Sequence, residues 1–270
     1  MTNRSASLGM YDRPEIQWAN DQLWKSIASR LREAGLTNVP DELDRERHLP
    51  AIWDDPGLLL AQCCGYPFVT RWRGRLRYIA TPRYRVNGCE GSDYRSRLVV
   101  RADEPAERLS ELRGRRAAIN ERGSNSGMNL FRAALAPLSG GHAFFSNVVE
   151  TGSHVESARR IIQGRADVAA IDTVSFAHLE RHEPETAHRL RTIGWTEAAP
   201  GLPLVTSIAT SAVDLKTLRR ALRSVSEEPA LTAVREELLL DGFESRKAER
   251  YDNLVRLEQQ AHKLGYPIIA

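Results

Sequence analysis

The stretch Asn120–Asn129, which reads N-E-R-G-S-N-S-G-M-N, decides how the middle of this chain folds. The apolar residues 116–119 precede it and predict a buried strand, and residues 127–138 follow it with the apolar spacing of a helix. Gly123 allows a tight turn, and the three residues after it are good helix caps. A strand, a small polar turn and a helix N-terminus bring N–H groups and hydroxyls together, which suits an anion. The alternative is an ordinary helix cap in a βα unit.

A second polar turn repeats this pattern. Residues 143–150 predict a strand, the turn T-G-S-H occupies residues 151–154, and residues 153–163 predict a helix. Two such turns in one lobe can present two helix N-termini to the same oxyanion. His154 by itself is also typical of a capping or surface histidine.

Asp172 marks a third change from strand to helix. The strand predicted for residues 168–171 ends there, and a helix begins. An aspartate at this point is either a plain N-cap or an acceptor for a protonated or amino group of a ligand.

Strands and helices alternate along the rest of the chain, which predicts an α/β fold. We expect two lobes, each a mostly parallel sheet flanked by helices, with a ligand cleft between them. Residues 1–97 and 200–270 are predicted to form lobe 1 from both chain ends, and residues 98–199 form lobe 2 as an insertion. Further predicted strands are residues 5–11, 36–43, 58–62, 76–84, 94–101, 190–196 and 204–210; further predicted helices are 16–34, 104–112, 213–226, 229–239 and 245–265.

Two tyrosines of lobe 1 follow predicted apolar strands. Tyr11 ends the first strand, and Tyr66 follows the strand of residues 58–62. Ligands of open α/β sheets bind outside the carboxyl ends of the strands, so these side chains are candidates to close over a ligand. Half-buried packing is the alternative for each tyrosine.

Charge and hydropathy exclude several classes of protein. The 270 residues contain 38 basic and 35 acidic ones, a formal net charge of +3, which gives no general field for nucleic acid. The run Arg71–Arg77, R-W-R-G-R-L-R, has a pattern that can bind RNA or phosphate, but an arginine-covered strand pair turning at Gly74 is the favoured interpretation. No apolar run is long enough to span a membrane. As written, the N-terminus has no export signal.

No pattern of a catalytic or metal site is present. Cys63, Cys64 and Cys89 offer neither a disulfide framework nor zinc-ligand spacing. The motifs G-x-S-x-G, H-E-x-x-H, G-x-G-x-x-G and the P-loop do not occur. We therefore expect no catalytic residue, no metal and no cofactor. A site of neutral donors suits reversible capture of an anion instead.

Three motifs in order, G-S-N-S-G at 123–127, T-G-S-H at 151–154 and G-R-A-D-V-A-A-I-D at 164–172, resemble a known family. They resemble the phosphate/phosphite/phosphonate (PhnD-like) substrate-binding proteins of ABC transporters, which have the type 2 periplasmic-binding fold. The resemblance covers roughly residues 5–240. It implies eight ligand-binding residues: Tyr11, Tyr66, Ser124, Asn125, Ser126, Ser153, His154 and Asp172.

The resemblance also assigns roles to these residues. Ser124, Asn125 and Ser126 would hold the anion's oxygens, Ser153 and His154 would add donors, and Asp172 with the two tyrosines would meet the far end of the ligand. Where the family often has an acidic residue after the second turn, this chain has Val155, which disfavours an aminoalkyl phosphonate.

The expected function is therefore capture of a phosphonate- or phosphate-like oxyanion between two hinged lobes, as the binding component of an ABC transporter with a permease as partner. The resemblance implies the periplasm, whereas the missing export signal leaves the cytoplasm as an alternative. One alternative function is a cytoplasmic enzyme on the same fold that makes thiamine or menaquinone precursors. The missing export signal and the pair Cys63 and Cys64 at the cleft mouth favour this alternative. Another is an intracellular ligand sensor.

Overall fold

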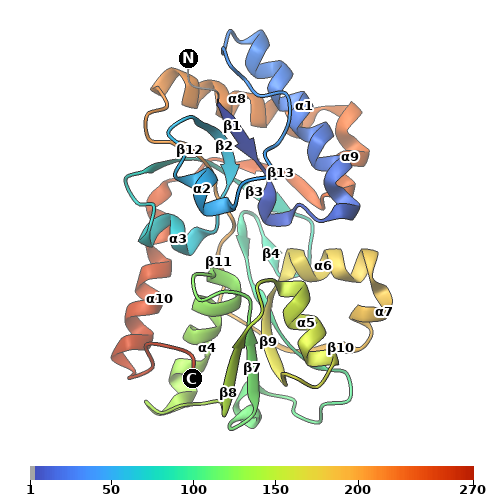
Figure 1. Ribbon diagram of the computed structural model, residues 1–270, viewed down its shortest axis with the longest axis vertical. Coiled ribbons are helices and arrows are strands. Elements are labelled where there is room, and N and C mark those ends of the chain that lie inside the picture. Colours follow the sequence, from blue (N-terminus) through green and yellow to red (C-terminus); the bar gives the residue numbers. More distant parts are fainter. Residues whose placement is uncertain (1–3) are drawn as a thin grey trace. The chain divides into compact units, whose positions relative to one another are not determined.

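The computed structural model describes residues 4–270, and contacts within the chain separate them into two units (Figure 1). Unit 1 contains the described residues up to Arg85, with Glu90–Ser92 and Pro200–Arg250. Unit 2 contains Val86–Cys89, Asp93–Ala199 and Tyr251–Ala270. Unit 2 thus takes in the last part of the chain, which the sequence analysis assigned to lobe 1. The small strands β4 (Cys89–Glu90), β5 (Asp93–Tyr94) and β11 (Ala199–Pro200) lie where the chain passes from one unit to the other.

The sheet of unit 1 has the strand order β1-β2-β12-β3-β13. Its strands are β1 (Ser5–Ser7), β2 (Leu58–Gln62), β12 (Leu204–Ser207), β3 (Leu76–Tyr84) and β13 (Leu240–Glu244). β1 pairs in parallel with β2, but β12 is antiparallel to both of its neighbours and β13 is antiparallel to β3. The prediction of a mostly parallel sheet is therefore wrong here, because β12 inserts between β2 and β3 after the chain returns from unit 2.

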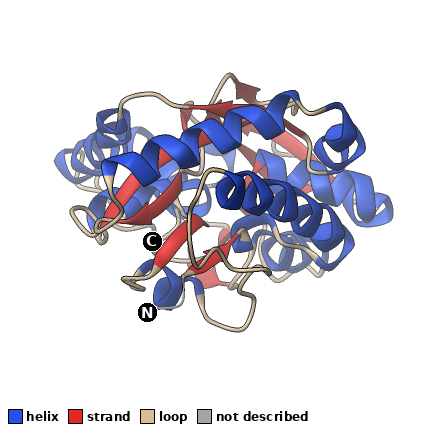
Figure 2. Ribbon diagram, turned by 90° about the horizontal axis from the view of Figure 1, so that it is seen from above, coloured by secondary structure: helices blue, strands red, loops and turns tan. Residues whose placement is uncertain are grey.

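Helices of unit 1 pack against its sheet and bury the core. They are α1 (Gln17–Glu33), α2 (Leu49–Trp53), α3 (Gly65–Thr70), α8 (Ala212–Glu227) and α9 (Thr232–Glu237). α1 buries Leu23, Trp24, Ile27 and Leu31 at helical spacing, and these residues share one apolar cluster with residues of α8 and the sheet. Figure 2 distinguishes the helices from the strands that they cover.

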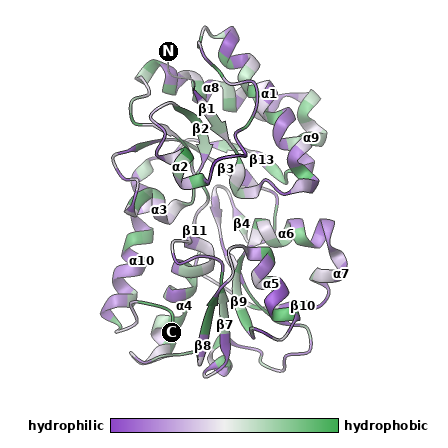
Figure 3. Ribbon diagram, viewed as in Figure 1, coloured by the Kyte–Doolittle hydropathy of each residue, from purple (hydrophilic) through white to green (hydrophobic). Residues whose placement is uncertain are grey.

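The sheet of unit 2 has the order β10-β6-β9-β7-β8. Its strands are β6 (Ser96–Arg101), β7 (Arg116–Ile119), β8 (Asn147–Glu150), β9 (Val168–Asp172) and β10 (Leu190–Trp195). β9, β7 and β8 are parallel to one another, whereas β6 is antiparallel to β9 and to β10. The three parallel strands have hydrophobic middles in Figure 3, and every residue of β9 is buried. Their carboxyl ends lead into the polar turns at residues 120–129 and 151–154 and into Asp172.

The helices of unit 2 are α4 (Leu130–Ser139), α5 (His154–Ile162), α6 (Thr173–His182), α7 (Pro184–Ala187) and α10 (Asp252–Lys263). α5 and α6 pack on the sheet. α10 buries Leu254, Leu257 and Ala261 and packs on α4, which is why the end of the chain belongs to this unit.

Several local predictions differ from the structure. The first strand is shorter than expected and ends in a 3₁₀ turn at Gly9–Tyr11, residues 36–43 form no strand, and residues 104–112 give only a 3₁₀ turn at Leu109–Leu112. β13 was not predicted, since Asp241 and Gly242 interrupt its apolar pattern, and its pairing with β3 shifts register there. No helix in the described part of the chain is long and apolar enough to cross a membrane.

Candidate functional site

The first polar turn of unit 2 joins β7 to α4. Ser124 caps the helix start, its hydroxyl accepting a hydrogen bond from Gly127 N at 3.1 Å. The first turn is π-helical over Asn125–Asn129, and Asn129 N donates to Ser124 O at 3.0 Å. π-helical turns often occur at functional sites. All five residues of this turn are buried, so its polar side chains are fixed by packing.

Close packing against this turn requires a glycine at position 127. A Cβ placed there would lie 1.9 Å from Asn120 Oδ1 and 3.1 Å from His154 Cε1. The absence of a side chain at Gly127 therefore lets the residues on both sides of the turn approach its backbone.

The second polar turn joins β8 to α5. Thr151 N and Gly152 N donate to Ile119 O and Asn120 O, at 2.9 and 2.8 Å, and these bonds hold the two turns side by side. Ser153 caps α5, its hydroxyl accepting from Glu156 N at 3.1 Å. His154 is the first residue of the helix.

The two turns meet at one side-chain hydrogen bond. Ser126 Oγ and His154 Nε2 lie 2.8 Å apart, and the backbone carbonyl of Ser126 accepts from Ser96 Oγ at 2.9 Å. The two turns are therefore adjacent, as the sequence pattern allows, while their binding of one shared oxyanion stays a prediction. Two helix N-termini, each with a partial positive charge, therefore point toward one polar spot.

His154 is neutral at pH 7. Burial lowers its pKa from the ordinary value of 6.5 to about 4. The residue is half-buried, but its Nδ1 atom is fully covered and makes no hydrogen bond to any of residues 4–270. The same holds for Asn120 Oδ1 at the other side of Gly127. Two buried polar atoms at one turn therefore have no partner among the described residues, whereas most buried polar groups in proteins are hydrogen-bonded.

Asp172 serves as the N-cap of α6. Its Oδ1 accepts from Val174 N at 2.8 Å and from Ser175 N at 3.0 Å, and the residue is almost completely buried. Of the two alternatives that the sequence offered for Asp172, the structure therefore shows the N-cap. Because Asp172 pairs with Ser96 across the sheet, and Ser96 binds the carbonyl of Ser126, its backbone lies close to the first turn.

Asn125 is committed to a buried network of side chains. Its Nδ2 donates to Tyr94 Oη at 3.0 Å, and its Oδ1 accepts from Asn129 Nδ2 at 3.1 Å. Asn129 also donates to Leu254 O of α10 and accepts from Arg132 at 2.7 Å. The predicted ligand residue Asn125 therefore holds the turn with its side chain.

Arg132 ends this network. Its guanidinium is buried in α4 and donates to Asn129 Oδ1 and to Pro267 O, at 2.7 and 2.8 Å, with Glu258 at 3.6 Å. The sequence analysis missed Tyr94, Asn129 and Arg132. The available signal was a polar residue at 129 and an arginine at 132, one helical turn apart within an apolar helix pattern.

The predicted tyrosines belong to unit 1. Tyr11 closes the 3₁₀ turn after β1 and packs edge-on against Tyr84, with ring centroids 5.6 Å apart. Tyr66 is buried in the first turn of α3, and its carbonyl accepts from Thr70 Oγ1 at 2.8 Å. Their role toward a ligand stays a prediction.

Two of the three cysteines have thiols with a raised pKa. Cys63 and Cys64 are free and buried, and burial raises the pKa of Cys63 well above that of an ordinary thiol. Burial and the nearby Asp172 raise the pKa of Cys89 to about 12. A thiol with a raised pKa is a poor nucleophile, so these cysteines give little support to the enzyme alternative. Across residues 4–270, no three His, Cys, Asp or Glu side chains are grouped so that they could hold a metal ion.

Comparisons with known structures agree with this architecture. A binding-protein component of an ABC phosphonate transporter from Pseudomonas aeruginosa is 16% identical, with a TM-score of 0.75 over 97% of this chain and 87% of that chain. PhnD1 from Prochlorococcus marinus, in complex with methylphosphonate, is 14% identical, with a TM-score of 0.74 over 96% and 98%. A Xanthomonas citri protein bound to ATP is 17% identical, with a TM-score of 0.70 over 97% and 98%. At these identities the similarity establishes the fold, that of two-lobed periplasmic binding proteins.

A comparison with curated proteins finds no match for this sequence. The family model described as "ABC transporter, phosphonate, periplasmic substrate-binding protein" matches residues 60–251, most of the chain. This range includes the two polar turns, Asp172 and the antiparallel strand β12. This protein belongs to the family of periplasmic substrate-binding proteins of phosphonate ABC transporters.

Proposed function

We propose that this protein captures a small phosphorus oxyanion at the two polar turns of unit 2 and presents it to the permease of an ABC transporter. The observation that carries the proposal is the 2.8 Å contact between Ser126 Oγ and His154 Nε2, where two helix starts meet. Membership of the phosphonate family supports the ligand class. Because the site consists of neutral donors and the thiols of Cys63 and Cys64 are buried, we propose capture without a chemical step.

The capping serines are suited to hold anionic oxygens. The hydroxyls of Ser124 and Ser153 each accept a backbone N–H, from Gly127 and Glu156 respectively. Each hydroxyl keeps its own proton, which it can donate to a ligand oxygen. Hydrogen bonds to a charged acceptor are about twice as strong as neutral ones, so a few neutral donors suffice to hold an oxyanion.

The third donor depends on the tautomer of His154. We propose that the proton of the neutral imidazole is on Nε2 and points to Ser126 Oγ, which leaves the Ser126 hydroxyl proton for the anion. The covered Nδ1 then carries only a lone pair, which costs less than a buried N–H without an acceptor. In this proposal Ser124, Ser126 and Ser153 donate to the anion, and His154 donates to Ser126.

The ligand chemistry we propose is phosphate, phosphite or a small alkyl phosphonate. An aminoalkyl phosphonate needs a carboxylate for its ammonium group. Val155 follows the second turn, and Asp172 uses Oδ1 to cap α6. We further propose that Tyr11 and Tyr66 of unit 1 contribute to affinity, and that Asn125 acts by holding the turn.

The proposal is tested by calorimetry with phosphate, phosphite, methylphosphonate, 2-aminoethylphosphonate, sulfate and acetate. We expect saturable binding of one phosphorus oxyanion, weakened by about 1–3 kcal/mol, or roughly 5- to 150-fold, in Ser126→Ala. Ser29→Ala is the control, since this exposed hydroxyl of α1 donates to Glu33. Unchanged affinity in Ser126→Ala, or a preference for carboxylates, would contradict the proposal.

A further inference from the structure

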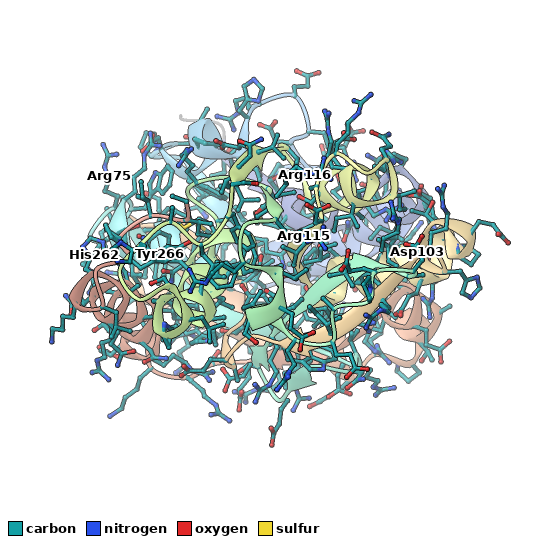
Figure 4. The ribbon with its side chains drawn as sticks, turned by 90° about the horizontal axis from the view of Figure 1, so that it is seen from below. Arg75, Asp103, Arg115, Arg116, His262 and Tyr266 are labelled. Atoms are coloured by element: carbon teal, nitrogen blue, oxygen red, sulfur yellow. The ribbon has the colours of Figure 1, made fainter. Side chains whose placement is uncertain are left out.

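The end of unit 2 that lies opposite the polar turns carries an unusual surface. β7 begins at Arg116 and reaches the first turn after Ile119, so the residues before it lie at the other end of the strand. Figure 4 looks at this end and labels Arg115, Arg116, His262 and Tyr266. We define the base surface as residues 112–116, 136–146 and 261–270.

Contacts join these three segments into one surface. Arg113 donates to Leu138 O and lies over the Phe144 ring, 4.6 Å from its centroid. Phe144 N donates to Ala270 O at 2.6 Å. The backbones of the Gly141 and Gly265 turns approach so closely that a Cβ at Gly265 would lie 3.2 Å from Gly141 Cα.

The base surface exposes large apolar side chains. Leu138, Leu264 and Ile268 are 37%, 49% and 60% exposed, and they are three of the seven large hydrophobic residues that are exposed within residues 4–270. Scattered exposed hydrophobic residues need no explanation, but a group of them on joined segments is typical of an interaction site.

The same surface is basic. Its segments contain Arg113, Arg115, Arg116 and Lys263 and no aspartate or glutamate. Arg116 is neutralised by Asp167, with 2.7 Å between Nη2 and Oδ1. Arg115 is exposed and lies near enough to the same carboxylate to help lower the pKa of Asp167, and Lys263 is exposed as well. The closest acidic residue in sequence, Glu111, pairs with Arg108 at 2.9 Å.

We propose that the base surface docks reversibly on the surface of an anionic phospholipid bilayer. Exposed leucine and isoleucine side chains bury at the headgroup boundary, while the cations meet lipid phosphates. A second copy of this chain fits less well, because a two-fold interface through this face would bring like charges together, and the nearby Asp167 already pairs with Arg116. Docking through this end leaves the polar turns, at the other end of the sheet, unobstructed.

The test is flotation of the purified full chain with lipid vesicles. We expect at least tenfold stronger partitioning onto vesicles with about one third phosphatidylglycerol than onto pure phosphatidylcholine, since each basic residue near such a surface contributes roughly fivefold. Roughly 0.5 M salt should abolish the difference, because it shortens the screening length to a few ångströms.

Two double variants with the same change in net charge test whether vesicle binding depends on the base surface or on the charge of the whole protein. Arg115→Glu with Lys263→Glu should reduce binding to anionic vesicles at least tenfold. Lys25→Glu with Lys216→Glu makes the same charge change at exposed lysines of unit 1, and this variant should keep most of the binding to anionic vesicles. A third variant, Leu264→Ser with Ile268→Ser, removes apolar side chains. It should reduce vesicle binding both at ordinary salt and at the high salt concentration.

Three outcomes would overturn the proposal. They are equal binding to neutral and anionic vesicles, equal losses in the two charge-reversal variants, and a concentration-dependent dimer that the base variants abolish. Unchanged thermal unfolding in the base variants shows that a lost interaction is not lost folding.

Discussion

The two ends of the unit 2 sheet differ in how their polar side chains are placed: buried and hydrogen-bonded at one end, exposed and charged at the other. At the carboxyl ends of the strands, Ser126, Asn125 and Asn129 are buried, and each makes hydrogen bonds to other side chains. At the base, Arg115 and Lys263 are exposed. The first arrangement is preorganised and neutral, so it can select one small anion by geometry. The second relies on charge and apolar area, so it suits a large surface without fixed geometry.

This difference explains where substitutions should matter. Polar groups that are buried and paired cost free energy when one partner is removed, because the other partner remains buried and unsatisfied. Exposed charges have no such partner to lose, so their removal leaves stability almost unchanged. The following predictions use this contrast, beginning with the largest expected effect.

Arg132→Met should lower the free energy of unfolding by about 3–5 kcal/mol, because it leaves Asn129 Oδ1, Pro267 O and Glu258 without their cation. Arg159→Met is the matched control, since that guanidinium is exposed and lies 3.5 Å from Glu183. The control should cost less than about 1 kcal/mol. Urea unfolding of both variants measures the effect, and equal losses would show that burial of Arg132 does not matter.

His154 should make unfolding depend on pH. Its pKa is lowered in the folded state, so the unfolded chain binds more protons between pH 6.5 and about 4. The stability that the neutral imidazole contributes is therefore fully present above pH 6.5 and is lost as pH falls toward 4, on the order of 3 kcal/mol in total. His154→Gln should remove this part of the pH dependence in urea unfolding from pH 7 to pH 4.

Glu121 lies at the same turn and also changes how stability depends on pH, so its contribution has to be measured separately. Burial and Glu150 raise its pKa, so it contributes in the opposite sense, and stability from this group falls as pH rises. The comparison is therefore repeated in a Glu121→Gln background. An identical pH dependence with and without His154 in that background would mean that its imidazole titrates normally.

The polar turns were predictable because their chemistry is local. The caps at Ser124, Ser153 and Asp172 follow from residue type at a strand end, and the bounds of β2 follow from a continuous apolar run. Pairing between distant segments was not predictable. The insertion of β12 between β2 and β3, the pairing of β13 and the packing of α10 on α4 depend on tertiary contacts that no local pattern encodes.

The network behind the site was hidden for a different reason. A buried arginine on an apolar helix face cannot be told from an exposed one by sequence spacing alone. Asn129 and Arg132 form a pair only because α10 brings the carbonyl of Leu254, and the tail brings that of Pro267, to the same place. Residue spacing therefore predicts the helix caps but not the network that supports the turn, to which the predicted ligand residue Asn125 also belongs.

Gly127→Ala should weaken both stability and anion binding, each by about 1–3 kcal/mol, since the new methyl group overlaps Asn120 Oδ1 and crowds His154. Gly123→Ala, four residues earlier in the same stretch, is the matched control because a Cβ there has nothing within 4 Å. Calorimetry and thermal unfolding of the pair measure the difference. Equal behaviour of the two variants would mean that Asn120 moves aside without effect on the turn.

The smallest effect is expected at the base. Arg115→Glu with Lys263→Glu should change the free energy of unfolding by less than about 0.5 kcal/mol, because both side chains are exposed to solvent and Asp167 near Arg115 keeps its ion pair with Arg116. Anion affinity should also stay within about twofold of the unmodified protein, since screening weakens charge effects beyond about 10 Å at ordinary salt. A larger loss of anion affinity would show that the base cations contribute a long-range field to the turns. In that case the two ends of the sheet would act on one ligand, and the contrast between neutral and charged recognition would be incomplete.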